Sequence, residues 1–150
     1  MAARGTDSDI RLVAAHLRPH PASPHLSATR APGVQTPTET LLYGTGSCRD
    51  SAYLFMEAAR RLGFASRFVS GYLHSPPSSA NFGATHAWAE VFLPGAGWKG
   101  FDPTIGEVVG TNHIAVAVAR MPESVPPVAG SFVGPPGASL DVGVWVSELQ

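Results

Sequence analysis

The chain has 150 residues, enough for one domain, and a formal net charge of −1 with its histidines neutral. Only 14% of the residues are charged, so the sequence predicts no basic surface for nucleic acid or for an anionic membrane. The 16 glycines and 14 prolines predict a chain rich in turns. Its one cysteine, Cys48, excludes an intrachain disulfide and a cluster of cysteine ligands around zinc.

The N-terminal residues do not resemble a secretory signal. Asp7 and Asp9 stand where a signal peptide would begin its apolar core. The longest apolar run, residues 114–119, is far shorter than the ~20 residues that cross a bilayer. We therefore expect a cytoplasmic protein without a membrane partner.

Residues 1–32 are predicted to form a poorly structured arm, because four prolines interrupt them and no helical or strand period is sustained. The arm contains His16, His20 and His25. We interpret these histidines as polar arm residues rather than metal ligands, because no carboxylate or cysteine accompanies them. The rest of the chain, residues 33–150, is predicted to form a single domain.

The first predicted helix begins at Pro37. Thr36 is a suitable cap, proline is favoured at the first helical position, and Glu39 can reach back to the cap amide. This helix must be short, because Gly44 and Gly46 follow soon after.

A second helix is predicted to begin after Ser47 and to run to about Leu62. Asp50 lies three positions after Ser47, so the pair forms a capping box with aspartate in place of glutamate. Gly63 is a typical residue to end such a helix. Steps of three and four residues predict an inner face made of Cys48, Ala52, Phe55, Ala59 and Leu62.

Beyond Gly63 the period of the apolar residues changes to two, which predicts strands. The predicted strands cover residues 64–73, 85–93, 98–102, 114–118 and 140–146. Residues 74–83 are predicted as a loop, and residues 94–97 as the turn of a hairpin. Helices followed by an antiparallel sheet are typical of an α+β fold.

Cys48 falls in the first turn of the second predicted helix. The N–H groups there have no partner within the helix, and the helix dipole favours negative charge, so this position favours a thiolate. The same N–H groups can stabilise the oxyanion that forms during acyl transfer. In the alternative interpretation, Cys48 is a small apolar residue packed beneath the sheet. The helix alone does not decide between the two.

His86 and Asp102 favour the catalytic interpretation. His86 shares one face of its predicted strand with Trp88 and Glu90, and Asp102 ends the next strand, just before Pro103. A histidine beside a cysteine, oriented by a carboxylate, is the arrangement that nucleophilic catalysis needs. Each residue alone has an ordinary explanation, because a strand histidine is usually structural and an aspartate before proline usually belongs to a turn.

The register of the predicted hairpin tests this triad. If Leu93 paired with Trp98, Asp102 would lie opposite Ala89, on the face of the sheet away from His86. A triad therefore predicts a shift of one residue, or a bulge, in this hairpin. An arrangement with His86 and Asp102 on opposite faces would exclude it.

Several motifs make the sequence recognisable. In chain order they are residues 33–37 (GVQTP), 44–50 (GTGSCRD), 61–72 (RLGFASRFVSGY), 86–91 (HAWAEV), 97–104 (GWKGFDPT) and 112–114 (NHI). Together they resemble the bacterial transglutaminase-like superfamily, whose papain-like core carries a Cys-His-Asp triad. The resemblance extends from about residue 26 to the C-terminus.

The resemblance implies an α+β fold with a papain-like core, in which the nucleophile lies at the N-terminus of a helix packed on an antiparallel β-sheet. By this resemblance Cys48 is the nucleophile, His86 is the general base and acid, and Asp102 orients the histidine. Trp88 and Trp98 are expected to wall the substrate cleft. Relatives in this branch usually have a longer helical lead-in, so the domain is expected to be shortened on its N-terminal side.

The predicted function is cysteine-dependent acyl transfer on peptide or isopeptide bonds of a peptide or protein substrate, with no cofactor and no metal. Hydrolysis is favoured over cross-linking, because bacterial relatives of this kind are more often credited with it. One alternative is a catalytically silent binding or scaffold module. Another is a zinc hydrolase using His74, His86 and Asp102, which is less well supported because these residues lack the short spacing of zinc ligands. The sequence assigns no role to His113, although it matches a family motif.

Overall fold

The computed structural model describes residues 33–74, 84–131, 133–134, 137, 139 and 142–147. The predicted arm, residues 1–32, and nearly all of the predicted loop at 74–83 lie outside the described residues. Within the described ranges, no helix is long and apolar enough to cross a membrane.

The described residues form two helices, one 3-10 turn and a single sheet. The helices are α2 (Pro37–Tyr43) and α3 (Cys48–Arg61), the turn is η1 (Pro122–Ser124), and the strands are β1 (Ser66–Leu73), β2 (Ala84–Leu93), β3 (Gly97–Asp102), β4 (Glu107–Val108) and β5 (His113–Ala119). The sheet is antiparallel throughout, with the strand order β4-β3-β2-β1-β5. The predicted α+β architecture is therefore confirmed.

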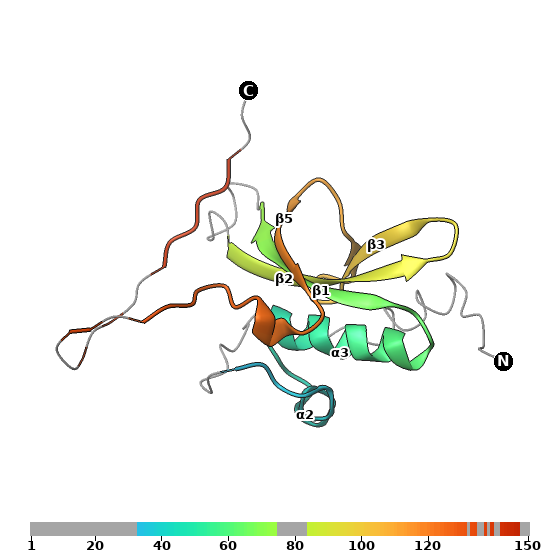
Figure 1. The fold of residues 1–150 in the computed structure, drawn as a ribbon, viewed down its shortest axis with the longest axis horizontal. Helices are drawn as coiled ribbons and strands as arrows, with labels where there is room; N and C mark the ends of the chain where they lie inside the picture. The colour runs from blue at the N-terminus through green and yellow to red at the C-terminus, as the bar shows by residue number, and fades with distance from the viewer. Residues whose placement is uncertain are drawn as a thin grey trace.

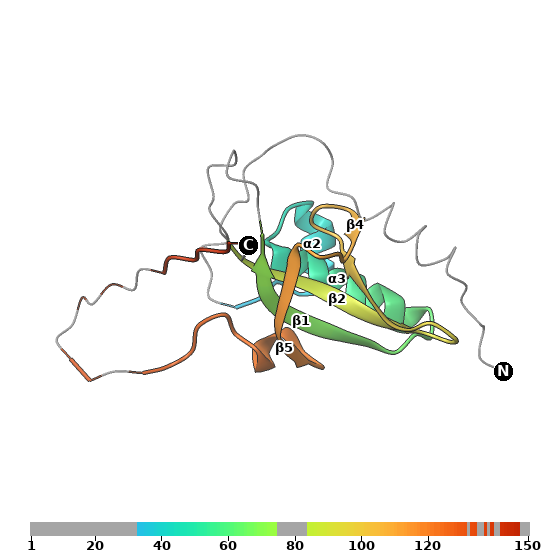
Figure 2. The same cartoon turned by 90° about the horizontal axis from the view of Figure 1, so that it is seen from above.

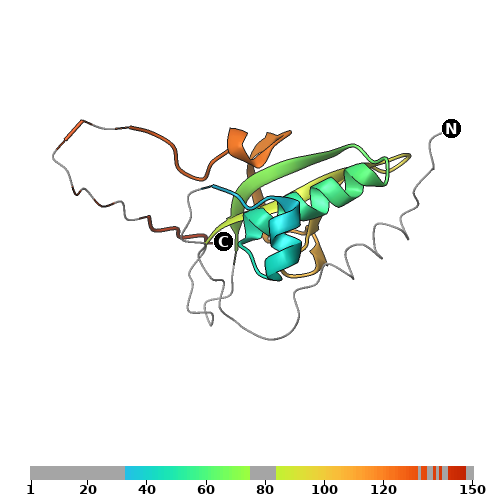
Figure 3. The ribbon, with the colours of Figure 1, turned by 90° about the horizontal axis from the view of Figure 1, so that it is seen from below.

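The two helices lie on the same side of the sheet. Helix α3 runs along one sheet face beneath β1 and β2 (Figures 1 and 2). Helix α2 lies beside the N-terminal end of α3 (Figure 3). The start of α3 is thus held between α2 and the sheet.

Both predicted capping boxes are present. In α2, the Thr36 hydroxyl accepts the Glu39 N–H at 3.3 Å, and the Glu39 carboxylate accepts the Thr36 N–H at 2.8 Å. In α3, the Ser47 hydroxyl accepts the Asp50 N–H at 3.4 Å, and the Asp50 carboxylate accepts the Ser47 N–H at 2.7 Å. Each capping box satisfies one N–H of the first turn and the N–H of the cap residue, and both helices begin where the sequence predicts.

The hydrophobic core lies between α3 and the sheet. Its buried residues are Ala52, Phe55, Met56 and Ala59 of α3, with Phe64, Phe68, Ala87, Ala89, Val91 and Phe101. The prediction for the helix face is wrong at Leu62, which is 37% exposed because it follows the last helical turn as the C-cap. Met56 takes a core position that the sequence analysis missed, one residue after Phe55.

β2, β3 and β5 each begin one residue earlier than predicted, and three larger differences remain. β1 begins at Ser66, two residues later than expected, and the short strand β4 was not predicted. The strand predicted at 140–146 does not form over residues 142–146, the part of it that the structure describes. Alternating apolar residues make a strand only when a neighbouring strand supplies hydrogen bonds, and here Val142 and Trp145 are exposed.

Candidate active site

The hairpin of β2 and β3 has the shifted register that a triad requires. Leu93 pairs with Gly97 instead of Trp98, since the loop contains only three residues, 94–96. Gly97 adopts a left-handed φ of 73°, a conformation that few other residues tolerate. With this register, Asp102 lies on the same sheet face as His86, and the predicted shift of one residue is confirmed.

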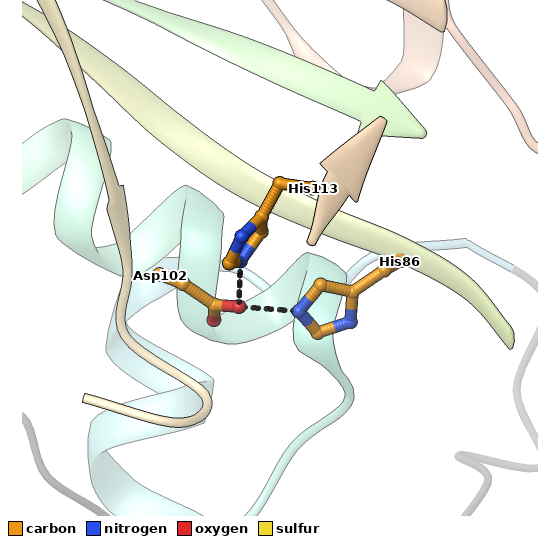
Figure 4. Close-up of side chains that lie close together, drawn as sticks. All are labelled: His86, Asp102 and His113. Carbon is orange, nitrogen blue, oxygen red and sulfur yellow. Dashed lines mark hydrogen bonds and ion pairs between the residues drawn. The ribbon is translucent and has the colours of Figure 1, made fainter. Parts of the chain in front are cut away.

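A buried carboxylate and two imidazoles meet on this face (Figure 4). Asp102 Oδ2 lies 2.5 Å from His86 Nε2 and 3.1 Å from His113 Nε2. Asp102 Oδ1 accepts the N–H of Thr104 at 2.9 Å and that of Ile105 at 3.4 Å. The side chains of Asp102, His86 and His113 are 0%, 8% and 3% exposed, so the cluster is shielded from water.

The environment stabilises a carboxylate–imidazolium pair. Burial works to lower the pKa of His86, but hydrogen bonds to Asp102 and Cys48, and the charges of both, raise it to about 9. Burial works to raise the pKa of Asp102, but the hydrogen bond and charge of His86, with hydrogen bonds from His113 and Thr104, lower it overall. The raised pKa of His86 and the lowered pKa of Asp102 both favour the charged form, as expected for a buried pair of opposite charges.

This pair predicts a pH-dependent stability. The pKa of His86 in the folded protein, about 9, is above the 6.5 of an unperturbed histidine, so protonated His86 stabilises the fold. The stabilisation is complete below pH 6.5 and is lost as the pH rises through 9. We expect the Tm of the wild type to fall more steeply between pH 6.5 and pH 9.5 than that of His86→Gln. Parallel Tm curves in scanning calorimetry would contradict the expectation.

Cys48 is the first residue of α3 and contacts the edge of the core. Its side chain is half-buried and lies near His86, whose pKa it helps to raise. Asp102 occupies His86 Nε2, so Nδ1 is the nitrogen left to face the thiol, and in Figure 4 it points away from the carboxylate. The structure therefore brings together all three residues of the predicted triad, with His86 in the middle.

Buried Asp50 fixes the loop that carries Cys48. One carboxylate oxygen accepts the Ser47 N–H, and the other accepts the Gln35 N–H, both at 2.7 Å. Gly46 permits this close packing, because a Cβ at that position would lie 2.9 Å from the Cβ of Asp50. The segment before α2 is thereby bound to the start of α3, directly beside the thiol.

Arg49, which matches a family motif, makes contacts that hold the fold together. Its guanidinium donates to the carbonyl of Val125 at 3.1 Å and to that of Pro122 at 2.5 Å. It also stacks over the ring of Phe68, 4.8 Å from the centroid. These contacts attach η1 to the N-terminal end of α3, at the residue that follows Cys48.

The two tryptophans predicted to line a cleft occupy different surroundings. Trp88 is 1% exposed and packs edge-to-face on His113, with ring centroids 5.2 Å apart, so it supports the imidazole cluster from within. Trp98 lies near the hairpin turn, where it contacts Phe92 and the guanidinium of Arg67. The structure brings Trp88 to the site but leaves Trp98 at the other end of β3.

The cluster also offers a set of metal-ligand atoms. One nitrogen each of His86 and His113 and one oxygen of Asp102 all lie within 4.8 Å of one another. His74, the third ligand of the zinc alternative, is not in this group. The backbone N–H of His74 donates to the Asn112 carbonyl at 2.8 Å. A metal ion would have to displace the protons between Asp102 and both imidazoles, so the hydrogen bonding favours an acid–base role.

A thiol at a helix N-terminus, beside a His–Asp pair on an antiparallel sheet, is the arrangement of papain-like proteins. The chain belongs to the transglutaminase-like superfamily, whose sequence profile matches residues 7–103. Its relatives include uncharacterized proteins of Mycobacterium leprae, 36% identical over 109 residues, and of Mycobacterium tuberculosis, 35% identical over 134 residues. These matches cover 69% and 83% of this chain, but only 38% and 42% of the relatives.

The fold is similar to that of a Cytophaga hutchinsonii protein whose crystal structure was described as that of a proposed cysteine protease. The TM-score is 0.55 and the identity 22%, over 75% of this chain and 34% of the other. The predicted family and its α+β fold are thus confirmed, and the chain spans about two fifths of the length of its mycobacterial relatives.

Proposed function

We propose that the protein is a cysteine-dependent acyl-transfer enzyme with Cys48, His86 and Asp102 as its catalytic triad. The proposal rests on one observation above all, the 2.5 Å contact between His86 Nε2 and Asp102 Oδ2. Asp102 engages Nε2 of the imidazole and leaves Nδ1 for the thiol, which is the order of roles that an activated cysteine requires.

The first half-reaction forms a thioester. His86 takes the thiol proton, and the thiolate of Cys48 attacks the carbonyl carbon of an amide. The negative charge passes to the carbonyl oxygen, where the N–H of Cys48, in the first turn of α3 and without a helical acceptor, is suited to stabilise it. His86 then returns the proton to the amine nitrogen as the C–N bond breaks, leaving the acyl group on sulfur.

The second half-reaction releases the acyl group. With water as the acceptor, His86 removes a proton from the attacking water and later returns it to the thiolate, which regenerates the enzyme. With an amine as the acceptor, the same steps produce a new amide bond. The Cytophaga hutchinsonii protein was described as a proposed cysteine protease, and this favours peptide or isopeptide bonds as the target and water as the acceptor.

A thioester on Cys48 is the test of this function. The protein is incubated with a bacterial peptide pool, quenched in acid and analysed by intact-protein mass spectrometry. We expect an added mass on the wild type that hydroxylamine removes, and no such mass on Cys48→Ala. Addition of a primary amine is expected to leave the decay rate of the thioester unchanged if water is the acceptor.

Two other outcomes would replace this proposal. A protein that forms no adduct in any pool would be a catalytically silent module that has kept the fold. A hydrolytic activity that persists in Cys48→Ala and disappears with a chelator would instead favour the metal-ligand set of His86, Asp102 and His113.

A further inference from the structure

His113, at the start of β5, shares the same carboxylate oxygen as the proposed catalytic histidine. His113 Nε2 lies 3.1 Å from Asp102 Oδ2, and the His86 and His113 rings have centroids 6.1 Å apart. In Figure 4 the two imidazoles approach this oxygen from different directions. In the described part of the chain, the side chain of His113 forms hydrogen bonds with Asp102 and Gly110 and none with Cys48, so any effect it has on the reaction must pass through Asp102.

The hydrogen bond at Nδ1 of His113 indicates which of its two ring nitrogens carries the proton. The backbone N–H of Gly110 donates to His113 Nδ1 at 3.3 Å. A backbone N–H can only donate, so Nδ1 is an acceptor and the ring proton must be on Nε2. His113 is therefore a neutral donor directed at Asp102, a role distinct from that of His86, which carries positive charge during the reaction.

The ring of His113 packs against Trp88, and its strand, β5, lies close to β1. Trp88 packs edge-to-face against it at an interplanar angle of 81°. β5 lies so close to β1 here that a Cβ on Gly71 would be 2.1 Å from the carbonyl oxygen of Ile114 and 2.9 Å from the Trp88 ring. Glycine at position 71 thus permits the packing that presents His113 to the carboxylate.

With His113 in place, Asp102 has a donor at every acceptor position. Oδ1 takes the N–H groups of Thr104 and Ile105, and Oδ2 takes His86 and His113. A carboxylate has about four such positions, so this one cannot rotate without losing a hydrogen bond in a buried site. Without His113, one position would be open and the carboxylate would be held only by its own turn and by the group it must orient.

We infer that His113 is a positioning residue of the proposed active site, acting on Cys48 only through Asp102 and His86. This inference rests on the proposed function. By fixing the plane of the carboxylate, His113 keeps the proton of His86 on Nε2 and leaves Nδ1 aligned with the thiol. The predicted consequence is that loss of the His113 donor weakens the thiolate–imidazolium pair while leaving the core intact.

The test measures alkylation of Cys48 by iodoacetamide at pH 6 in the full chain, which needs no substrate. His113→Phe keeps an aromatic ring against Trp88 but removes the donor, and we expect it to slow alkylation by on the order of 10-fold. His113→Gln places an amide N–H near the position of Nε2 and is expected to restore most of the rate. In an Asp102→Ala background, His113→Phe is expected to cause no further slowing.

The controls separate the inference from folding defects and from the proposed function. His74→Phe changes a histidine outside the cluster and should leave the rate unchanged. If His113→Gln is as slow as His113→Phe, or if the two changes at 113 and 102 are additive, the inference is wrong. If the rate does not depend on His86 or Asp102 either, the proposed function itself fails.

Discussion

Replacement of His86 by alanine is expected to slow the alkylation of Cys48 at pH 6 by on the order of 100-fold, since an ordinary thiol is largely protonated there and only the thiolate attacks. In the proposed triad, protonated His86, whose pKa is raised to about 9, lies beside the sulfur at that pH and attracts the negative charge of the reacting sulfur. Cys48 is the only cysteine in the chain, so the label incorporated over time reports on this residue alone.

The pH dependence supplies the control for this experiment. At pH 10 any thiol is ionised, so the wild type and His86→Ala are expected to react at similar rates. A buried thiol that simply lacks access to the reagent would stay slow in both proteins at pH 10. Equal rates at pH 6 would show that the histidine does not activate the cysteine, and would favour the silent-module alternative.

Features that depend on a few neighbouring residues could be predicted from the sequence. The starts of α2 and α3 follow from Thr36 with Glu39 and from Ser47 with Asp50, because each capping box is closed within four residues. The position of Cys48 in the first turn of α3 follows from the same local bonds. Nothing distant has to be known to place the proposed nucleophile.

The register of the β2–β3 hairpin could be predicted from a chemical requirement, although the local sequence alone did not decide it. The local sequence allowed two registers, and one of them placed His86 and Asp102 on opposite faces. The requirement that they meet selected a shift of one residue, and the structure has it because the loop is one residue shorter than the predicted turn.

Contacts between distant segments could not be predicted in this way. His113 reaches Asp102 only because β5 pairs with β1 next to Gly71, a pairing that joins residues far apart in the chain. Its motif marked the residue, but the sequence contains no local signal for the direction of its ring. The strand predicted at 140–146 is the converse case, since its local alternation is good but its described part, residues 142–146, has no partner strand among the described residues.

Asp102→Asn is expected to lower the rate of acyl transfer by about 10⁴-fold, the effect that the same change has on the aspartate of a serine-protease triad. In this protein the reason can be given atom by atom. Both oxygens of Asp102 accept hydrogen bonds, Oδ1 from Thr104 and Ile105 and Oδ2 from His86 and His113. An asparagine must place its NH₂ group against one of these pairs of donors.

Neither orientation of the asparagine preserves the site. If the NH₂ group takes the position of Oδ1, it faces the backbone N–H groups of Thr104 and Ile105, which cannot accept a hydrogen bond. A buried donor is then left without a partner. With NH₂ toward Oδ2, His86 must accept at Nε2, which moves its proton to Nδ1, where the neutral imidazole can no longer take the proton of Cys48. In both orientations the negative charge that stabilises the imidazolium is gone.

The matched control is Glu107→Gln, which makes the same change of carboxylate to amide at the residue that pairs with Asp102 across β3 and β4. Glu107 is exposed, so its replacement should leave the rate within about twofold of the wild type, as for most surface changes. Thioester formation on Cys48 in single-turnover measurements is the readout for both variants. An Asp102→Asn protein that forms the thioester at the wild-type rate would show that His86 is oriented without the carboxylate, and the triad would reduce to a Cys–His pair.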